Sequence, residues 1–381
     1  MFYKDASTER FIIGGMSGTS SDGVTFALIR TKGAYIEKRI AFLDYVDIKY
    51  LKELREEIFS LYPGKKFCIE NIAKIEHKVM GLYINAIEHL LKKTNIPKKE
   101  ISLISYQGPI LYYAPPLCIE LSRPSKIKET FDIPVISHLR EQDIAAGGRG
   151  APLSPYVDYL LFHNKTKGRI IQNIGGIANL TAIFPGQSID EVISFDTGPG
   201  NMIIDYLVNE FFEKPYDKDG EIAKSGKVSK KLLDWLMMHP YIKKNPPKTT
   251  GREVFGETFG KKVILKAKEL GISKEDTIAT LTLFTVEAIL LNYKKFVFPY
   301  GRIDEIILGG GGVYNKTLIK MLKERLPGIE IHTHKDYGIP DEAREALTWA
   351  ILGDETFCGI PSNLPHITGA KKKVLQGSIT L

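Results

Sequence analysis

The chain has 381 residues, of which 43% are hydrophobic and 25% are charged, a composition typical of a globular protein with about two or three domains. Its net charge of +7 comes mostly from scattered lysines, so no nucleic-acid-binding stripe is predicted. No apolar run is long enough to span a membrane, the first residues lack a signal-peptide core, and the three cysteines form no CxxC pair. We therefore expect a cytoplasmic protein with no nucleic-acid or membrane partner and no structural zinc.

The first predicted element is a strand, a tight turn and a second strand over residues 11–30. Glycines in the turn permit close approach of a ligand, and several N–H groups and hydroxyls can converge on phosphate groups. An acid there would repel phosphate unless a cation lay between them, which makes Asp22 a candidate Mg²⁺ ligand. An ordinary hairpin with a polar turn fits the spacing equally well. The candidate phosphate-binding residues are Gly15, Ser17, Gly18, Thr19, Ser20, Asp22 and Gly23.

A third strand at 35–46 is predicted to extend this hairpin into an antiparallel meander. A short buried strand at 101–105 then leads to Gln107, at the kind of strand end that carries ligand sites in α/β sheets. A further strand at 133–137 precedes a loop with Arg140 and Asp143, whose later glycines and proline exclude a long helix.

The second half repeats this pattern. Strands at 169–173 and 179–184 flank a glycine turn, and a strand at 192–195 ends at Asp196. A Gly/Asn-rich turn and a helix from residue 202 follow, an arrangement that predicts an anion site made of N–H groups and the helix dipole. The alternative is an ordinary connection with turn residues. We predict two related α/β lobes, with candidate binding residues Gly175, Gly176, Gly198, Gly200 and Asn201.

A strand at 303–308 runs into four consecutive glycines, which indicate close approach of a bound ligand and offer no side chain for catalysis. The candidates there are Gly310, Gly311, Gly312 and Asn315. His332 and His334 share a strand face, but without a third ligand at suitable spacing a strand end is favoured over a metal site.

Two further residues are candidates for recognition or for structure alone. Arg252, in a proline-stiffened loop, could bind a carboxylate or phosphate, although an exposed ion pair is equally compatible. Glu345 lies near the start of a predicted helix at 341–352, where an acid can also serve only to stabilise the helix dipole. The tail is predicted to return as a strand at 373–375.

Several motifs together resemble the anhydro-N-acetylmuramic acid kinase family of the acetate and sugar kinase/Hsc70/actin superfamily. The resemblance is collinear over nearly the whole chain. It implies a two-lobed actin-like (ribonuclease H-like) α/β fold with the nucleotide between the lobes, and a boundary that places 1–138 and 350–381 in one lobe and 139–349 in the other. The motifs are GMSGTSSDG at 15–23, DIAAGGRGAPLSP at 143–155, NIGGIANLT at 173–181, FDTGPGNMIID at 195–205, PPKTTGRE at 246–253, GGGGVYN at 309–315 and GIPSNLPHITGA at 359–370.

This resemblance implies an enzyme that uses ATP and Mg²⁺. It would open the 1,6-anhydro ring of a cell-wall-derived muramic sugar with water and phosphorylate O6 of that sugar. Asp196 matches the family's general base and Glu345 an acid at the sugar end, while 17–23 would hold the β- and γ-phosphates and 309–312 the adenosine. The positions matched to sugar binding are Gln107, Arg140, Asp143, Asn179 and Arg252.

Departures from the family pattern occur on the sugar side, at Thr25, Tyr106, His138 and Arg149. They leave open a different anhydro sugar, a non-anhydro sugar, or a nucleotide-gated sugar-binding protein without turnover. A Rossmann dehydrogenase is not predicted, because no GxGxxG opens a helix after the first strand. A homodimer is compatible with the sequence.

Overall fold

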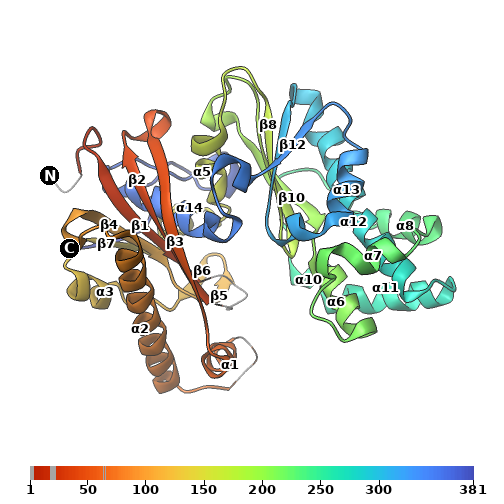
Figure 1. Cartoon of the computed structure of the whole chain (residues 1–381), viewed down its shortest axis with the longest axis horizontal. Coiled ribbons are helices and arrows are strands. Elements are labelled where there is room, and N and C mark those ends of the chain that lie inside the picture. The colour runs from red at the N-terminus through yellow and green to blue at the C-terminus, as the bar shows by residue number, and fades with distance from the viewer. Residues whose placement is uncertain (1–3, 18–22, 63, 65) are drawn as a thin grey trace. The chain divides into compact units, whose positions relative to one another are not determined.

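The computed structural model describes residues 4–17, 23–62, 64 and 66–381, and divides the chain into two compact units (Figure 1). Unit 1 comprises residues 1–161 and 338–381, and unit 2 comprises residues 162–337. This division differs from the predicted one, because residues 139–161 and 338–349 belong to unit 1. Each unit is built on its own mixed β-sheet, so the prediction of a two-lobed α/β fold is confirmed.

Unit 1 contains a six-stranded sheet in the order β13-β7-β4-β1-β2-β3 and a separate hairpin of β5 and β6. Strands β1 to β3 form the predicted antiparallel meander, and β4 pairs with β1 in parallel. The strands are β1 (Arg10–Met16), β2 (Gly23–Lys32), β3 (Arg39–Lys49), β4 (Ile101–Gln107), β5 (Ile110–Ala114), β6 (Leu117–Glu120), β7 (Val135–Ser137) and β13 (Ser378–Thr380). The helices are α1 (Lys52–Ser60), α2 (Ile69–Thr94), α3 (Pro124–Phe131), α4 (Glu141–Ala145), α5 (Ser154–Phe162), α14 (Arg344–Phe357) and α15 (Pro365–Thr368).

Alternation along β2 gives the sheet of unit 1 two buried faces. Phe26 and Leu28 pack into a core with α2, whereas Ala27 faces the opposite side with Ala346 of α14. A Cβ atom at Gly14 would overlap the backbone of α14, so glycine here allows the helix to lie directly on β1.

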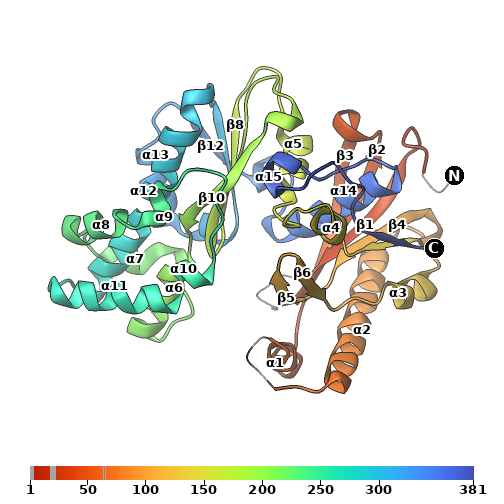
Figure 2. The same cartoon turned by 180° about the vertical axis from the view of Figure 1, so that it is seen from behind.

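The C-terminal segment completes unit 1 and explains its boundary. Strand β13 pairs antiparallel with β7, which places it three residues beyond the predicted tail strand at 373–375. Helix α15 lies beside α4 (Figure 2), where Thr368 donates a hydrogen bond of 2.7 Å to Asp143. Because these contacts join 143–150 to the C-terminal segment, both belong to one core.

Unit 2 contains a five-stranded sheet in the order β10-β9-β8-β11-β12. Its strands are β8 (Arg169–Ile174), β9 (Ile177–Ile183), β10 (Ile193–Pro199), β11 (Glu305–Gly309) and β12 (Glu330–Thr333). Helices α12 and α13 pack on this sheet, and helices α6 to α11 build a second core with α12. The helices are α6 (Met202–Phe212), α7 (Glu221–Ser225), α8 (Lys230–Met237), α9 (Pro240–Lys243), α10 (Arg252–Phe255), α11 (Glu257–Glu269), α12 (Lys274–Phe296) and α13 (Lys316–Glu324).

The two sheets share one topology. The order β3-β2-β1-β4-β7 in unit 1 matches β10-β9-β8-β11-β12 in unit 2, and in each the first three strands are antiparallel and the last three are parallel. The prediction of two related lobes is therefore confirmed. Within the described residues, no helix combines the length and apolarity needed to cross a membrane.

Candidate active site

Asp196 lies in β10 at an irregular position, where the pairing with β9 shifts register between Asp196 and Gly198. Its Oδ2 atom accepts a hydrogen bond of 2.8 Å from the backbone N–H of Thr250. Its own backbone N–H donates to the carbonyl oxygen of Lys248 at 3.2 Å. One loop therefore holds both the backbone and the carboxylate of this half-buried residue, which orients it as a general base requires.

A row of polar residues crosses the sheet of unit 2 from Asp196. Asp196 lies directly opposite Asn179 on β9, Asn179 lies opposite Asn173 on β8, and Asn173 lies opposite Gly309 on β11. Residues opposite one another in a sheet share a face, so Asn179 is a side-chain neighbour of Asp196. The fold thus brings the predicted sugar-binding Asn179 to the predicted base.

The start of α6 differs from the predicted anion site. The backbone N–H groups of Gly200 and Met202 donate to the carbonyl oxygen of Gly176, and that of Asn201 donates to Gly175, at 2.8–3.1 Å. A Cβ atom at Gly200 would overlap the Gly175 carbonyl. These three N–H groups therefore join the helix start to the β8–β9 turn, and they do not form the predicted phosphate site.

Backbone conformation and packing explain two of the glycines in the run at 309–312. Gly310 has φ of +79°, a conformation that favours glycine, and a Cβ atom at Gly312 would overlap the side chain of Ile174. Gly311 is different, since a Cβ atom there would lie 3.7 Å from its nearest neighbour, the side-chain amide of Asn201. Packing accounts for Gly310 and Gly312, whereas Gly311 lies open at a cavity wall.

That cavity, of about 400 Å³, lies within unit 2 and has a volume suited to a small-molecule ligand. It includes three predicted binding residues, and Asn315 also caps α13 by accepting a hydrogen bond from Leu318 N–H at 2.9 Å. The segment 216–219, in a charged and lysine-rich part of the sequence, was not among the predicted site residues. The lining residues are Asn201, Ile204, Asp205, Tyr216, Asp217, Lys218, Asp219, Gly311, Tyr314 and Asn315.

Two acids in this cavity have different roles. Asp217 is buried, and its carboxylate accepts hydrogen bonds from the N–H groups of Ile222 and Ala223 at 2.8 and 2.9 Å, at the start of α7. Asp205 lies on α6, where burial, with a contribution from the charge of Asp217, raises its pKa to about 7. The motif at 195–205 ends with Asp205, which was the available sequence signal for this residue.

In unit 1 the described ends of the first turn are closely packed. Gly15 is buried, and a Cβ atom there would overlap the ring of Phe26, so packing alone already requires glycine at this position. Ser17 is also buried, and its N–H donates to the carbonyl oxygen of Gln107 at 3.3 Å, while Gly23 begins β2. The predicted residues Gly18, Thr19, Ser20 and Asp22 lie outside the described residues.

Unit 1 brings three of the predicted sugar-side residues together. The Nε atom of Arg140 donates to the Oε1 atom of Gln107 at 2.7 Å, and one terminal nitrogen donates to the Gly150 carbonyl at 2.8 Å. The guanidinium carbon lies 5.2 Å from the ring centre of Trp349, one turn along α14 from Glu345. Arg140 is therefore fixed by an amide, a carbonyl and an aromatic ring before any ligand binds.

Two carboxyl groups near Arg140 hold their protons more tightly than usual. Desolvation raises the pKa of Glu345, against the opposing charges of Arg344 and Arg140. Part of the Glu345 side chain remains open to solvent, so this desolvation is incomplete and the carboxyl group can exchange protons with water. Burial raises the pKa of Glu120 to about 8, although Glu120 accepts a hydrogen bond of 2.8 Å from Gly108 N–H. No pattern in the sequence singled out Glu120, which the structure places on β6.

Asp143, which was predicted to contact the substrate, is instead held by hydrogen bonds within the protein. It is 0% exposed and accepts hydrogen bonds from Gly150 N–H, the Asn363 amide and the Thr368 hydroxyl, all at 2.7–2.8 Å. It therefore fixes the loop that carries Arg140.

The four residues that depart from the family pattern all contact other residues of unit 1. Tyr106 is buried in the core, Arg149 donates to the Ile367 carbonyl, His138 contacts the Ser137 hydroxyl, and Thr25 donates to Asp47. These contacts give each side chain a structural partner.

Arg252 begins α10, two residues after Thr250, and is exposed. Among the described residues, its side chain forms no hydrogen bond or ion pair. It is therefore accessible to an acidic ligand near Asp196.

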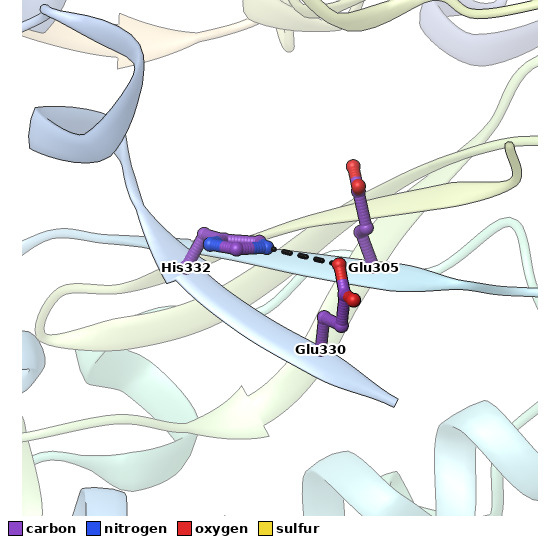
Figure 3. Close-up of side chains that lie close together, drawn as sticks. All are labelled: Glu305, Glu330 and His332. Atoms are coloured by element: carbon purple, nitrogen blue, oxygen red, sulfur yellow. Dashed lines mark hydrogen bonds and ion pairs between the residues drawn. The ribbon is translucent and has the colours of Figure 1, made fainter. Parts of the chain in front are cut away.

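A group of two glutamates and one histidine in unit 2 has the composition of a metal site. Ligand atoms of Glu305, Glu330 and His332 lie within 4.8 Å of one another (Figure 3). Glu305, however, already forms ion pairs with Lys167 and Arg169, so this group is an ion-pair network. His334 follows β12 and is buried against the ring of Phe162, whereas His332 lies on β12 itself.

Comparisons with known proteins agree with the motifs. The family model described as anhydro-N-acetylmuramic acid kinase matches residues 10–381. The chain is 41% identical over 379 residues to the anhydro-N-acetylmuramic acid kinase of Bacillus thuringiensis subsp. konkukian (strain 97-27), covering 97% of this chain and 99% of that protein. It is 39% identical over 385 residues to the protein of the same name from Caldanaerobacter subterraneus subsp. tengcongensis, covering 98% and 97%.

A solved ROK family glucokinase from Streptomyces griseus, in complex with glucose and AMPPNP, is similar at a TM-score of 0.38 and 10% identity, covering 90% of this chain and 98% of that chain. That similarity is too weak to support an assignment, whereas the sequence matches extend over almost the full length. The chain therefore belongs to the anhydro-N-acetylmuramic acid kinase family.

Proposed function

We propose that this kinase opens 1,6-anhydro-N-acetylmuramic acid with water and transfers the γ-phosphoryl group of ATP to O6. The observation that carries the proposal is the position of Asp196, whose carboxylate is oriented by Thr250 N–H and flanked by Asn179. The products are the sugar 6-phosphate and ADP. A binding protein without turnover would not need an oriented carboxylate at this strand position.

Asp196 accepts a proton from a water molecule as the oxygen of that water bonds to the anomeric carbon. The bond between that carbon and O6 breaks, and O6 forms a bond to the γ-phosphorus as the bond to ADP breaks. Proton removal by a positioned base contributes about 10²–10⁴ in rate. Orientation of O6 and neutralisation of charge supply most of the phosphoryl-transfer step.

The sugar is assigned to Gln107, Arg140, Asn179 and Arg252. Arg140 is held by Gln107 with its plane against Trp349, which suits it to bind a carboxylate. Arg252, in unit 2, offers a second guanidinium, which is exposed. A muramic sugar carries a carboxylate, and either guanidinium would favour it over a neutral sugar.

The nucleotide is assigned to the turn at 17–23 and to the cavity at Gly311. The open wall at Gly311 and the volume of about 400 Å³ suit the adenosine part of ATP. Asp22 is the proposed Mg²⁺ ligand, and the ion would neutralise phosphate charge. Use of ATP supports a cytoplasmic location.

The test is Asp196→Asn, measured as ADP release with ATP, Mg²⁺ and the anhydro sugar. The amide cannot accept the proton of water, so kcat should fall by about 10²–10⁴ while both substrates still bind. Asp234→Asn, at an exposed ion pair on α8, is the matched control and should retain wild-type kcat. Wild-type kcat in Asp196→Asn would contradict the assignment.

A further inference from the structure

Lys248 is a buried cation that the mechanism above does not use. It is 2% exposed and lies in the loop between α9 and α10. Its Nζ atom is 5.5, 5.0 and 5.4 Å from the ring centres of Phe195, Tyr241 and Phe296. A buried ammonium is costly, so this aromatic cage indicates that the charge is retained for a reason.

The cage connects directly to the proposed base. Phe195 precedes Asp196 on β10, and the Lys248 carbonyl oxygen accepts the Asp196 N–H. The Tyr241 hydroxyl donates to the Asp196 carbonyl oxygen at 2.9 Å. Two residues beyond Lys248, the N–H of Thr250 donates to the Asp196 carboxylate. Three hydrogen bonds of Asp196 outside the sheet therefore involve residues of this cage or its loop.

We propose that Lys248 is a positioning residue, whose caged ammonium fixes the 248–250 loop so that Thr250 N–H orients the Asp196 carboxylate. The proposal rests on the function assigned to Asp196 above. The ammonium also contributes a positive charge near that carboxylate, which favours its ionised form.

The charged groups around Lys248 determine the pH at which its ammonium loses its charge. Burial and the charges of Lys295 and Lys244 lower the pKa of Lys248 to about 8, whereas Asp196 opposes that effect. The Tyr241 hydroxyl stays protonated, because burial and the charges of Asp196 and Glu253 raise its pKa. Lys248 should thus lose its charge above about pH 8, and the orientation of Asp196 should weaken there.

The test compares Lys248→Met with Lys248→Arg and with Lys295→Met. The Nζ atom of Lys295 lies 4.8 Å from the ring centre of Phe296, but the Lys295 side chain is exposed. Lys295 is therefore a matched control, a lysine that contacts the same ring from outside the cage. Methionine fills the cage without charge and should lower kcat about tenfold or more, because small misplacement of a catalytic group is costly. KM values should stay within about twofold, since neither substrate loses a contact.

The pH profile separates positioning from mere stability. In Lys248→Met the acidic limb of kcat/KM should move to higher pH, because Asp196 loses a neighbouring positive charge. In Lys248→Arg, which stays charged, the wild-type decline near pH 8 should move to higher pH. Lys295→Met should keep the wild-type kcat at neutral pH, and its decline near pH 8 should move to higher pH, because one of the charges that lower the pKa of Lys248 is removed.

Three results would overturn the proposal: wild-type kcat in Lys248→Met, an equal loss in Lys295→Met, or a decline near pH 8 that is unchanged in Lys248→Arg. The last comparison remains available if the methionine variant fails to fold. Failure of the proposed function is a separate result, since wild-type protein would then release no ADP with the anhydro sugar.

Discussion

Asp205 shows how a single residue can make the cavity proposed for the nucleotide sensitive to pH. Its pKa rises from 3.8 to about 7 in the folded protein, so the folded state holds this proton more tightly than the unfolded state does. The resulting stability is complete below about pH 4 and is lost as the pH rises through 7. Ionisation there also adds a negative charge to a cavity assigned to the nucleotide.

Asp205→Asn should therefore remove a pH-dependent penalty. At pH 8 the variant should be more stable than wild type by roughly 1–3 kcal/mol. This value is smaller than the free energy implied by the whole pKa shift, because the carboxyl group of Asp205 is partly exposed to solvent. The difference should shrink towards pH 5, as urea unfolding at both values can show. The KM of wild type for ATP should rise from pH 6 to 8, and that of the variant should change less. The same pH dependence in both proteins would contradict the role of Asp205.

Single residues also show where sequence reasoning failed. Gly200 and Gly15 were assigned to ligand binding, but each is glycine because a neighbouring carbonyl or ring leaves no room for a Cβ atom. A glycine that makes room for a ligand and one that makes room for protein are identical in sequence. Asp143 could not be distinguished from a ligand-binding acid for the same reason, since its three partners are supplied by the folded chain.

At the scale of elements, the ion pairs of Glu305 join neighbouring strands. Glu305 on β11 lies opposite Arg169 on β8 and also contacts Lys167 and Tyr337. Burial alone would raise the pKa of Glu305, but hydrogen bonds from Lys167, Arg169 and Tyr337 lower it to about 2. This network therefore contributes stability that is present above about pH 4.5 and lost as the pH falls through 2.

Glu305→Gln should destabilise the protein by about 2–4 kcal/mol at pH 7, because it leaves Arg169 without its charged partner in a mostly buried site. Glu330→Gln, whose side chain is 64% exposed against 4% for Glu305, is the control and should change stability by less than about 0.5 kcal/mol. Thermal unfolding at pH 7 and 3 should show the Glu305 effect shrinking in acid. Equal effects of the two substitutions would refute the network.

Elements with strong local signals were predictable, and contacts between distant elements were not. The strand, turn and strand at 11–30 and the repeat at 169–195 follow from short apolar runs separated by glycines. The cavity proposed for the nucleotide joins 201–205, 216–219 and 311–315, and no local pattern relates these segments. The tail strand was placed too early because β13 depends on an open edge of β7, which the sequence does not reveal.

At the scale of the whole molecule, one sheet topology occurs twice and each copy carries a different part of the assigned chemistry. Unit 1 holds Arg140, Gln107 and the described ends of the turn at 17–23. Unit 2 holds Asp196 and the cavity at Gly311. The boundary was predicted imperfectly because residues 139–161 and 338–349 join unit 1 through tertiary contacts alone. The motifs nevertheless identified the family, since they occur in order along almost the full chain.

The most direct test follows the oxygen of water during turnover by the wild-type enzyme. With ATP, Mg²⁺ and 1,6-anhydro-N-acetylmuramic acid in H₂¹⁸O, hydrolytic opening places one ¹⁸O atom on the anomeric carbon of the 6-phosphate product at the moment of release. Rapid quenching and mass spectrometry must precede exchange through the open-chain form. We predict this single label. An unlabelled product, or turnover of a reducing sugar with none of any anhydro sugar, would contradict it.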